Sequence, residues 1–400
     1  MLPPRIVRRL VFPPLVFLLT VGALVLSPLL LVLAVVALPS RSGRRRALRL
    51  IWFALAWLVM ESAALVAALG LWITSGFGGR LRTEASMDRH YGLVRWFLAT
   101  LFRIALRVFR LKVEIEEPPP TAEELAARLA RPVIVLSRHA GPGDSFLLVH
   151  HLLSLYRRKP RIVMKAALQF APSLDVVINR LPHAFVHPRR RPAPARPAAP
   201  ASAASATSAT SVTEAASSEA PMESAVVGEI RRLAAGLGPT GALVIFPEGG
   251  NFTPARWRRG INKLEESRRY EEARRARAME NLLPPRSGGA FAAIDSAPSA
   301  DVIFVAHTGL DDLITVGDIW RALPMEQIIK AKWWRVPAPD VPRERDEVVR
   351  WLYEWWERID TWIAENRPVR PSRPWRRRPV PDSGGARDRP STPHAGPGGR

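Results

Sequence analysis

The stretch Leu243-Val-Ile-Phe-Pro-Glu-Gly-Gly-Asn251 carries four large apolar residues that end at a proline, a carboxylate and two glycines. An apolar run of this length with a breaker behind it predicts a buried strand followed by a loop. Ligands of α/β sheets bind at such loops, and glycines let backbone N–H groups approach a phosphate or a developing oxyanion closely. The same pattern also fits a simple turn that ends the strand.

A second strand end lies about 100 residues earlier, at Ser137-Arg-His-Ala-Gly-Pro-Gly-Asp-Ser145. On a regular helix, His139 and Asp144 would point about 140° apart. The Gly-Pro-Gly between them predicts a bend that brings the two side chains together. A histidine paired with a carboxylate is a general base held in one tautomer, able to take a proton from a hydroxyl near pH 7. Alternatively, Asp144 only caps the next helix and His139 is a turn residue.

Short β-rich runs alternate with helical stretches around these two motifs. This alternation predicts an α/β fold in which a sheet has helical cover. The expected strands are Val133–Ser137, Arg161–Lys165, Ala184–His187, Ala242–Phe246 and Asp301–Ala306. The expected helices are Ala122–Leu129, Ser145–Tyr156, Ser224–Gly236, Trp257–Met279 and the Trp-rich Arg343–Asn366.

Two segments have a composition that does not support a core. Residues 191–222 consist mainly of Ala, Ser, Pro and Thr, and residues 367–400 are rich in Pro, Arg and Gly. Such chains cannot bury enough apolar surface to fold. We therefore expect a disordered insertion in the α/β part and a disordered basic tail.

The N-terminal quarter predicts a hydrophobic helical membrane anchor. Residues 11–38 contain no charge, and residues 51–75 contain only Glu61. As helices, both runs exceed the ~30 Å hydrocarbon core of a bilayer. Arginines lie before, between and after the two runs. Two full spans would place the middle cluster on the opposite side of the membrane from the other two, whereas a re-entrant hairpin keeps all three clusters on one side, as the positive-inside rule favours. We favour the hairpin, and we expect Pro28 to kink or split the first helix.

Residues 91–111 predict an amphipathic helix with Arg95, Arg103, Arg107 and Arg110 in one arc. Such a helix suits the headgroup layer of a membrane, and it equally suits a surface helix packed on a core. Glu61 indicates either an intramembrane functional site or a contact between helices. The chain thus divides into an anchor over 1–82, an α/β domain over 83–366 and a tail over 367–400.

Composition limits the classes of function. The 400 residues hold 58 Lys and Arg against 36 Asp and Glu, a net charge of +22, and no Cys. The missing Cys excludes disulfides, thiolate metal sites and Cys nucleophiles, and the sequence has no G-x-S-x-G, Walker A or H-E-x-x-H motif. The positive charge, nearly all Arg, predicts anionic partners such as a phospholipid surface, nucleic acid or a phosphorylated substrate.

His139, Asp144 and Phe246-Pro-Glu-Gly249 together resemble the glycerolipid acyltransferase family, which contains the 1-acylglycerol-3-phosphate acyltransferases and related lysophospholipid acyltransferases. The first block of that family is His-x4-Asp, and its third is Phe-Pro-Glu-Gly. The third block commonly continues as Glu-Gly-Thr-Arg, whereas this chain reads Glu248-Gly-Gly-Asn251. Loss of that arginine removes a bidentate phosphate contact, so either Arg256, Arg258 or Arg259 replaces it or the acceptor is not simple lysophosphatidic acid.

The second block of the family resembles Phe185-Val-His-Pro-Arg189, which follows Lys165. An extra proline leaves its arginine at Arg189 or Arg190. The resemblance covers about residues 85–365 and implies a membrane-bound acyltransferase. The enzyme would move a fatty acyl group from acyl-CoA or acyl carrier protein to the hydroxyl of a lysophospholipid, on the cytoplasmic side of a membrane.

The resemblance also implies roles for individual residues. His139 would deprotonate the acceptor hydroxyl, and Asp144 would hold the imidazole. The implied substrate-binding residues are Glu248, Gly249, Gly250, Lys165 and Arg189 or Arg190. No metal, no cofactor and no nucleic-acid partner is implied; membrane lipids, the acyl donor and the lysophospholipid acceptor are the expected partners.

Two other classes of function remain open from the residues alone. A non-catalytic, membrane-anchored basic protein that binds anionic lipid or nucleic acid would explain the charge, and its binding would fall steeply with salt. It would not explain why both motifs follow strands. A hydrolase using the same His and Asp is a weaker alternative, because no nucleophile is evident.

Overall fold

The computed structural model describes residues 2–38, 40–117, 121–141, 143–186, 213–311 and 316–368. A seven-stranded sheet lies at its centre, with the strand order β1-β7-β6-β2-β5-β3-β4. All strand pairings are parallel except that of β6 with β7. The strands are β1 Lys112–Ile115, β2 Val133–Ser137, β3 Lys159–Lys165, β4 Ala184–Val186, β5 Gly241–Ile245, β6 Asp301–Thr308 and β7 Ile328–Val336.

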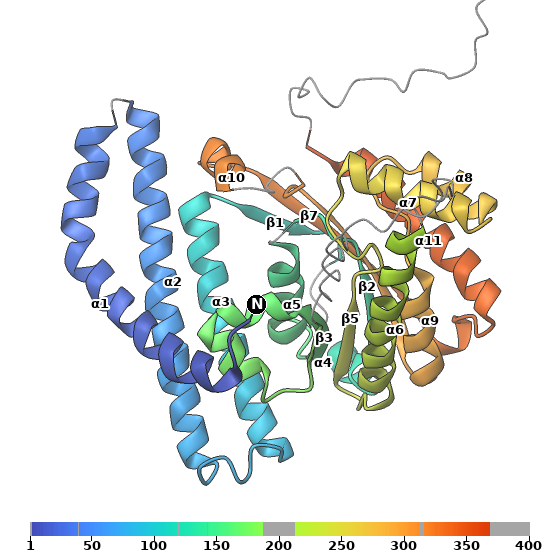
Figure 1. The fold of residues 1–400 in the computed structure, drawn as a ribbon, viewed down its shortest axis with the longest axis horizontal. Helices are drawn as coiled ribbons and strands as arrows, with labels where there is room; N and C mark the ends of the chain where they lie inside the picture. Colours follow the sequence, from blue (N-terminus) through green and yellow to red (C-terminus); the bar gives the residue numbers. More distant parts are fainter. Residues whose placement is uncertain are drawn as a thin grey trace, which may run out of the picture. The chain divides into compact units, whose positions relative to one another are not determined.

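Helices cover both faces of this sheet (Figure 1). The larger core packs α6, α9 and α11 against one face, where Phe304 of β6 contacts three tryptophans of α11. On the other face, Leu148 and Leu152 of α5 pack on β2 and β5. The predicted α/β class is confirmed. The described helices of the α/β part are α4 Ala122–Arg128, α5 Asp144–Ser154, α6 Thr213–Ala235, α7 Pro254–Glu266, α8 Tyr270–Ala278, α9 Ser287–Ser296, α10 Val316–Ala322 and α11 Arg345–Asn366.

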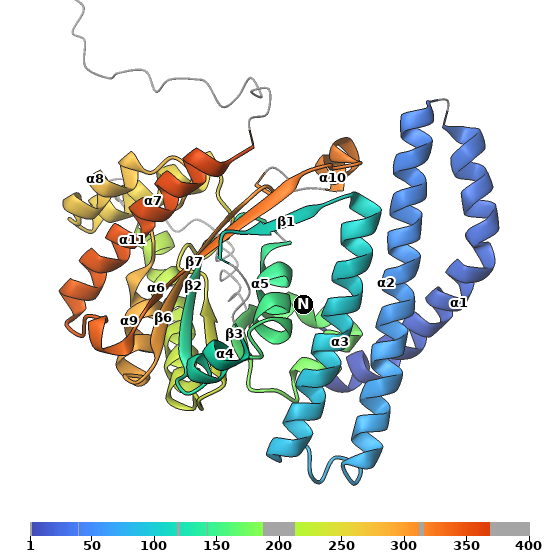
Figure 2. The same ribbon diagram turned by 180° about the vertical axis from the view of Figure 1, so that it is seen from behind.

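Three N-terminal helices are layered outward from α5 (Figures 1 and 2). They are α3 Glu84–Phe109, α2 Arg41–Thr74 and α1 Arg5–Ala37. Both α1 and α2 are long and apolar enough to cross a membrane. The ribbon of α1 bends along its length, but the helix continues through Pro28, so a split at this proline was the wrong alternative.

The predicted amphipathic helix is longer than expected, and its apolar face is occupied inside the protein. Leu93 and Leu101 of α3 are buried, and the helix packs between α2 and α5. The arginine arc, in contrast, is exposed. The packing of Leu93 and Leu101 fits a helix on a core, whereas the exposed Trp96 and the exposed arginines also fit a headgroup layer, so the interfacial role of α3 stays a prediction.

Other differences from the sequence analysis have local causes. The expected helix Trp257–Met279 is two helices, α7 and α8, because the chain turns at Arg268, where φ is 59°. Residues 213–222 of the expected disordered insertion form the first turns of α6, and their Ala, Glu and Met content favours a helix. The remainder of the insertion, residues 191–212, and the tail from residue 369 onward lie outside the described residues.

Candidate active site

The two motifs meet at one edge of the sheet because β2 and β5 are adjacent and parallel. The register pairs Leu136 with Ile245, so the loops that follow these strands begin side by side. The neighbouring strand β6 is parallel to β2 and ends at the same edge. The backbone N–H of His139 donates to Glu248 Oε1 over 2.8 Å, which joins the two loops directly.

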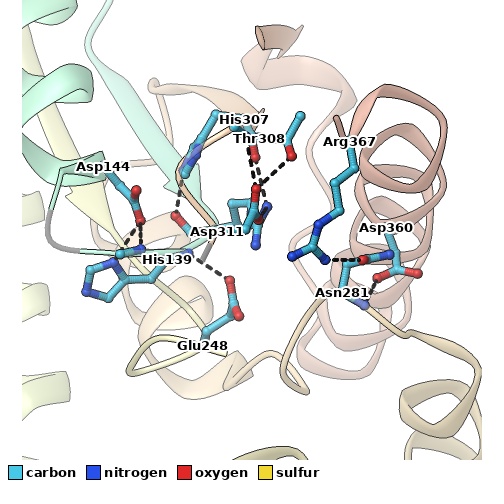
Figure 3. Close-up of polar contacts among 12 residues, drawn as sticks. His139, Asp144, Glu248, Asn281, His307, Thr308, Asp311, Asp360 and Arg367 are labelled. Carbon is cyan, nitrogen blue, oxygen red and sulfur yellow. Dashed lines mark hydrogen bonds and ion pairs between the residues drawn. The ribbon is translucent and has the colours of Figure 1, made fainter. Parts of the chain in front are cut away.

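His139 and Asp144 form the predicted pair (Figure 3). His139 Nδ1 lies 3.3 Å from Asp144 Oδ2, and the backbone N–H of Gly141 donates to the same oxygen. The Asp144 side chain is fully buried, whereas the His139 side chain is 22% exposed. Asp144 is the first residue of α5, and its carboxylate turns back toward the loop. The imidazole is therefore oriented by a buried carboxylate and keeps one side open to a reactant.

Phe246, the residue directly after β5, supports the imidazole, since the centroids of the Phe246 and His139 rings lie 4.9 Å apart. Because Asp144 engages Nδ1, the proton of the neutral imidazole is held at Nδ1 and the lone pair is left at Nε2. An aromatic wall on one side and a carboxylate behind Nδ1 limit the orientations of the ring. These contacts suit a general base better than a turn residue.

Glu248 is buried, and both its carboxylate oxygens accept backbone N–H groups. Oε1 accepts from His139, and Oε2 accepts from Leu283 over 3.1 Å. Burial raises the pKa of Glu248 from 4.5 to about 7, against the opposing effects of Arg138 and of the two backbone amides. The family resemblance implies that Glu248 binds the acceptor headgroup, and this role stays a prediction; in the structure, both carboxylate oxygens accept backbone N–H groups of the protein.

A buried arginine fixes the other side of the same loop. Arg138 Nη1 donates to the backbone carbonyl of His307 over 2.8 Å and to Asp311 Oδ1 over 2.7 Å. Asp311 also accepts from Thr308 Oγ1 and from the Gly309 backbone. Burial alone would raise the pKa of Asp311, but Arg138 and these hydrogen bonds outweigh burial and lower it.

Arg138 and Asp311 were absent from the sequence prediction. Arg138 stands inside the quoted motif next to His139, and Asp311 follows the end of β6 by three residues. A charged residue directly before a catalytic candidate and a carboxylate behind a neighbouring strand end were the available signals. Their pairing could not be deduced, because it depends on β6 lying beside β2.

The remaining predicted residues fall into two groups. Gly249, with φ +67°, and Gly250 follow Glu248 at the same turn, while Lys165 is exposed at the C-terminal end of β3. No hydrogen bond joins Lys165 to the motif residues in the part of the chain that the structure describes. Arg189 and Arg190 lie outside the described residues. Among the described residues, no three His, Asp or Glu side chains are grouped as metal ligands would be.

A comparison with protein families supports what this geometry indicates. A family model described as Acyltransferase matches residues 110–308, a span that holds β1 to β6 and both motifs. Residues 110–308 are therefore an acyltransferase domain of the glycerolipid acyltransferase family. No curated protein and no solved structure matches the chain.

Proposed function

We propose that the chain is a membrane-bound acyltransferase that moves a fatty acyl group from acyl-CoA or acyl carrier protein to the hydroxyl of a lysophospholipid, such as 1-acylglycerol 3-phosphate. The observation that carries this proposal is the His139–Asp144 pair, partly exposed at the sheet edge and joined to the Phe-Pro-Glu-Gly loop through Glu248. The family assignment supports acyl transfer in general.

The proposed reaction needs only this pair to handle protons. His139 Nε2 takes the proton of the acceptor hydroxyl while the hydroxyl oxygen attacks the thioester carbonyl. Asp144 stabilises the imidazolium that forms. The tetrahedral intermediate then expels the thiol sulfur, which receives the proton from His139, and an ester bond has replaced the thioester.

The test is turnover of labelled acyl-CoA by the purified full chain, in detergent, against a panel of lysophospholipids. His139→Ala should remove at least on the order of a hundredfold of the rate. His183→Ala is the matched control, because His183 is also a histidine of the α/β domain but lies directly before β4, where its Nδ1 accepts from the Ile162 backbone N–H. Near wild-type turnover by His139→Ala, or equal losses in both variants, would contradict the mechanism.

We further propose that α1 and α2 form a re-entrant hairpin, with the catalytic domain on the cytoplasmic side. Glu61, near the middle of α2, accepts from both the backbone N–H and the hydroxyl of Ser173, over 2.8 and 2.7 Å. A span centred on the middle of α2 would therefore bring Ser173, a residue of the α/β domain, into the bilayer centre. Unpaired backbone in the hydrocarbon layer is costly, which favours the hairpin.

The outer surface of the hairpin supports membrane attachment. Exposed large apolar residues follow one another along α1, and Trp52 and Val66 on α2 are also exposed. Contiguous apolar surface of this kind marks a contact with lipid or protein.

The chain has no Cys, so a single Ser42→Cys variant in the first turn of α2, next to the hairpin turn, can be labelled without removal of native cysteines. In sealed inverted vesicles, a hairpin predicts that a membrane-impermeant thiol reagent labels Cys at position 42 from the same side as an Arg274→Cys control on α8. Labelling from opposite sides would indicate two full spans.

A further inference from the structure

The peptide unit between Arg138 and His139 is held at both of its polar groups by buried side chains. Its N–H, which belongs to His139, donates to Glu248 Oε1 over 2.8 Å. Its carbonyl oxygen, which belongs to Arg138, lies 3.3 Å from Nε2 of His307. Because the N–H and the C=O of a trans peptide point in opposite directions, Glu248 and His307 reach this plane from opposite sides (Figure 3).

The contact at the carbonyl fixes the proton of the His307 ring. A carbonyl oxygen only accepts, so Nε2 of His307 carries the proton and donates it. Burial lowers the pKa of His307, whereas the carboxylates of Asp144 and Asp311 oppose this effect. Arg138 adds to the lowering, so the neutral ring is favoured. Nδ1 of His307 has no hydrogen-bond partner among the described residues, and the Arg138 carbonyl is therefore the polar contact that the ring makes.

His307 and Arg138 bind one another reciprocally. Arg138 Nη1 donates to the His307 carbonyl over 2.8 Å, so each side chain binds the backbone carbonyl of the other residue. Arg138 directly follows β2 and His307 lies near the end of β6, which is the parallel neighbour of β2. The two residues are only 2% and 3% exposed, so water does not compete for these hydrogen bonds.

The contacts of Glu248 and His307 act on the peptide in the same sense. A donor at the carbonyl and an acceptor at the N–H both polarise the peptide, so each hydrogen bond strengthens the other. The peptide plane ends at the Cα atom of His139, and the imidazole is attached to this atom through Cβ. Fixing the plane therefore fixes the origin of the candidate base before Asp144 orients its ring.

We propose that His307 is a positioning residue for the base and that its side chain acts through the peptide between Arg138 and His139. The His307 ring is buried and touches no reactant in this role. The inference rests on the proposed function for the reaction that the base performs, but the hold on the peptide can be measured without turnover.

The kinetic test compares His307→Asn with His307→Gln in the full chain in detergent. The amide nitrogen of glutamine can take the place of Nε2, whereas asparagine is too short to reach the Arg138 carbonyl. With labelled acyl-CoA and 1-acylglycerol 3-phosphate, His307→Asn should lower kcat by about tenfold or more and leave KM nearly unchanged, because small displacements of a base are costly. His307→Gln should restore most of kcat.

Hydrogen exchange of the His139 amide reports on the same contact without turnover. His307→Asn should speed this exchange and leave that of the Ile162 amide unchanged, and His307→Gln should restore the protection. His183→Ala is the matched control: it removes the acceptor of the Ile162 N–H, so it should speed exchange at Ile162 and leave the His139 amide and kcat unchanged. If His307→Asn does not fold, His307→Phe, which has a planar ring without a donor, takes its place.

Three results would overturn the proposal. In the first, His307→Asn leaves a measurable wild-type kcat, or the exchange of the His139 amide, unchanged. In the second, His307→Gln loses as much as His307→Asn. In the third, exchange at Ile162 rises as much as at His139, which would indicate general destabilisation. A wild type that transfers no acyl group, together with selective exposure of the His139 amide in His307→Asn, would leave the hold on the peptide standing and remove the proposed function.

Discussion

Glu248→Gln should remove the fall in stability that the wild type shows between pH 5 and pH 8, and it should lower the activity. Burial raises the pKa of Glu248 from 4.5 to about 7, so between these values the folded protein binds a proton that the unfolded chain has lost. Stability therefore falls as the pH rises through this window. Relative to a pH below both pKa values, this shift lowers the free energy of unfolding by about 3 kcal/mol at pH 8 but by less than about 1 kcal/mol at pH 5. Glutamine is neutral at every pH and lacks this loss.

The activity should move the other way. The ionised carboxylate accepts from His139 N–H and Leu283 N–H at once, whereas a glutamine has one carbonyl oxygen and must oppose one of these donors with its own N–H groups. A loosened His139 loop costs rate, because displacements of about 1 Å reduce catalysis by as much as a hundredfold. A more pH-resistant but slower variant would show that ionised Glu248 lowers the stability of the protein while it holds the His139 loop in place.

The assay is thermal unfolding in detergent at pH 5 and pH 8, together with initial rates at pH 8. The lost acceptor costs Glu248→Gln the same free energy at both pH values, so we expect its melting temperature relative to that of the wild type to be several degrees higher at pH 8 than at pH 5. Glu354→Gln, on the exposed face of α11, is the control and should not change the pH dependence. If the difference between Glu248→Gln and the wild type is the same at both pH values, burial does not govern the protonation of Glu248, and the reasoning is refuted.

Three further outcomes follow from the same contacts. Asp144→Asn should lower kcat by about 10²- to 10⁴-fold with little change in melting temperature, measured by initial rates and thermal unfolding, because the amide no longer fixes the His139 tautomer. Glu61→Gln should lower the free energy of unfolding by about 1–3 kcal/mol, measured by denaturant titration in detergent, because one buried donor on the α/β domain loses its acceptor. Deletion of residues 191–212 should leave kcat within about twofold of the wild type, because their composition does not support packing; a large loss would mean that this segment contacts a substrate.

Much of the sheet could be predicted because β2, β5 and β6 are buried, and an apolar run reveals a strand without knowledge of its neighbours. The strand β7 was missed because Lys330, Lys332 and Arg335 interrupt its apolar residues. These charges are explained only by tertiary pairs, such as Lys332 with Glu116 and Arg335 with Asp301.

The residues of the candidate site also fall into those that the sequence could predict and those that only the fold brings together. The His139–Asp144 pair lies within one loop, so its spacing and the bend between the two residues were readable from the sequence. The partners of Glu248 and Arg138 come from residues that are distant in the chain and near in space, Leu283 and Asp311. Spacing within a motif indicates which residues react, whereas the register between β2, β5 and β6 determines which residues hold them.

The hairpin is held to a segment that follows β3, a strand that ends at the same sheet edge as the candidate base. In the segment after β3, Asp175 pairs with Arg8 of α1, and Ser173 binds Glu61 of α2. The strands β3 and β5 are parallel neighbours, so the segment after β3 and the loop after β5 begin at the same edge of the sheet. The loop after β5 contains Glu248, which accepts from the His139 backbone. Breaking a buried ion pair such as Arg8–Asp175 costs about 3–5 kcal/mol, so the hairpin cannot easily shift against the sheet. Under the proposed membrane attachment, the depth of the hairpin would therefore set the height of His139 above the lipid.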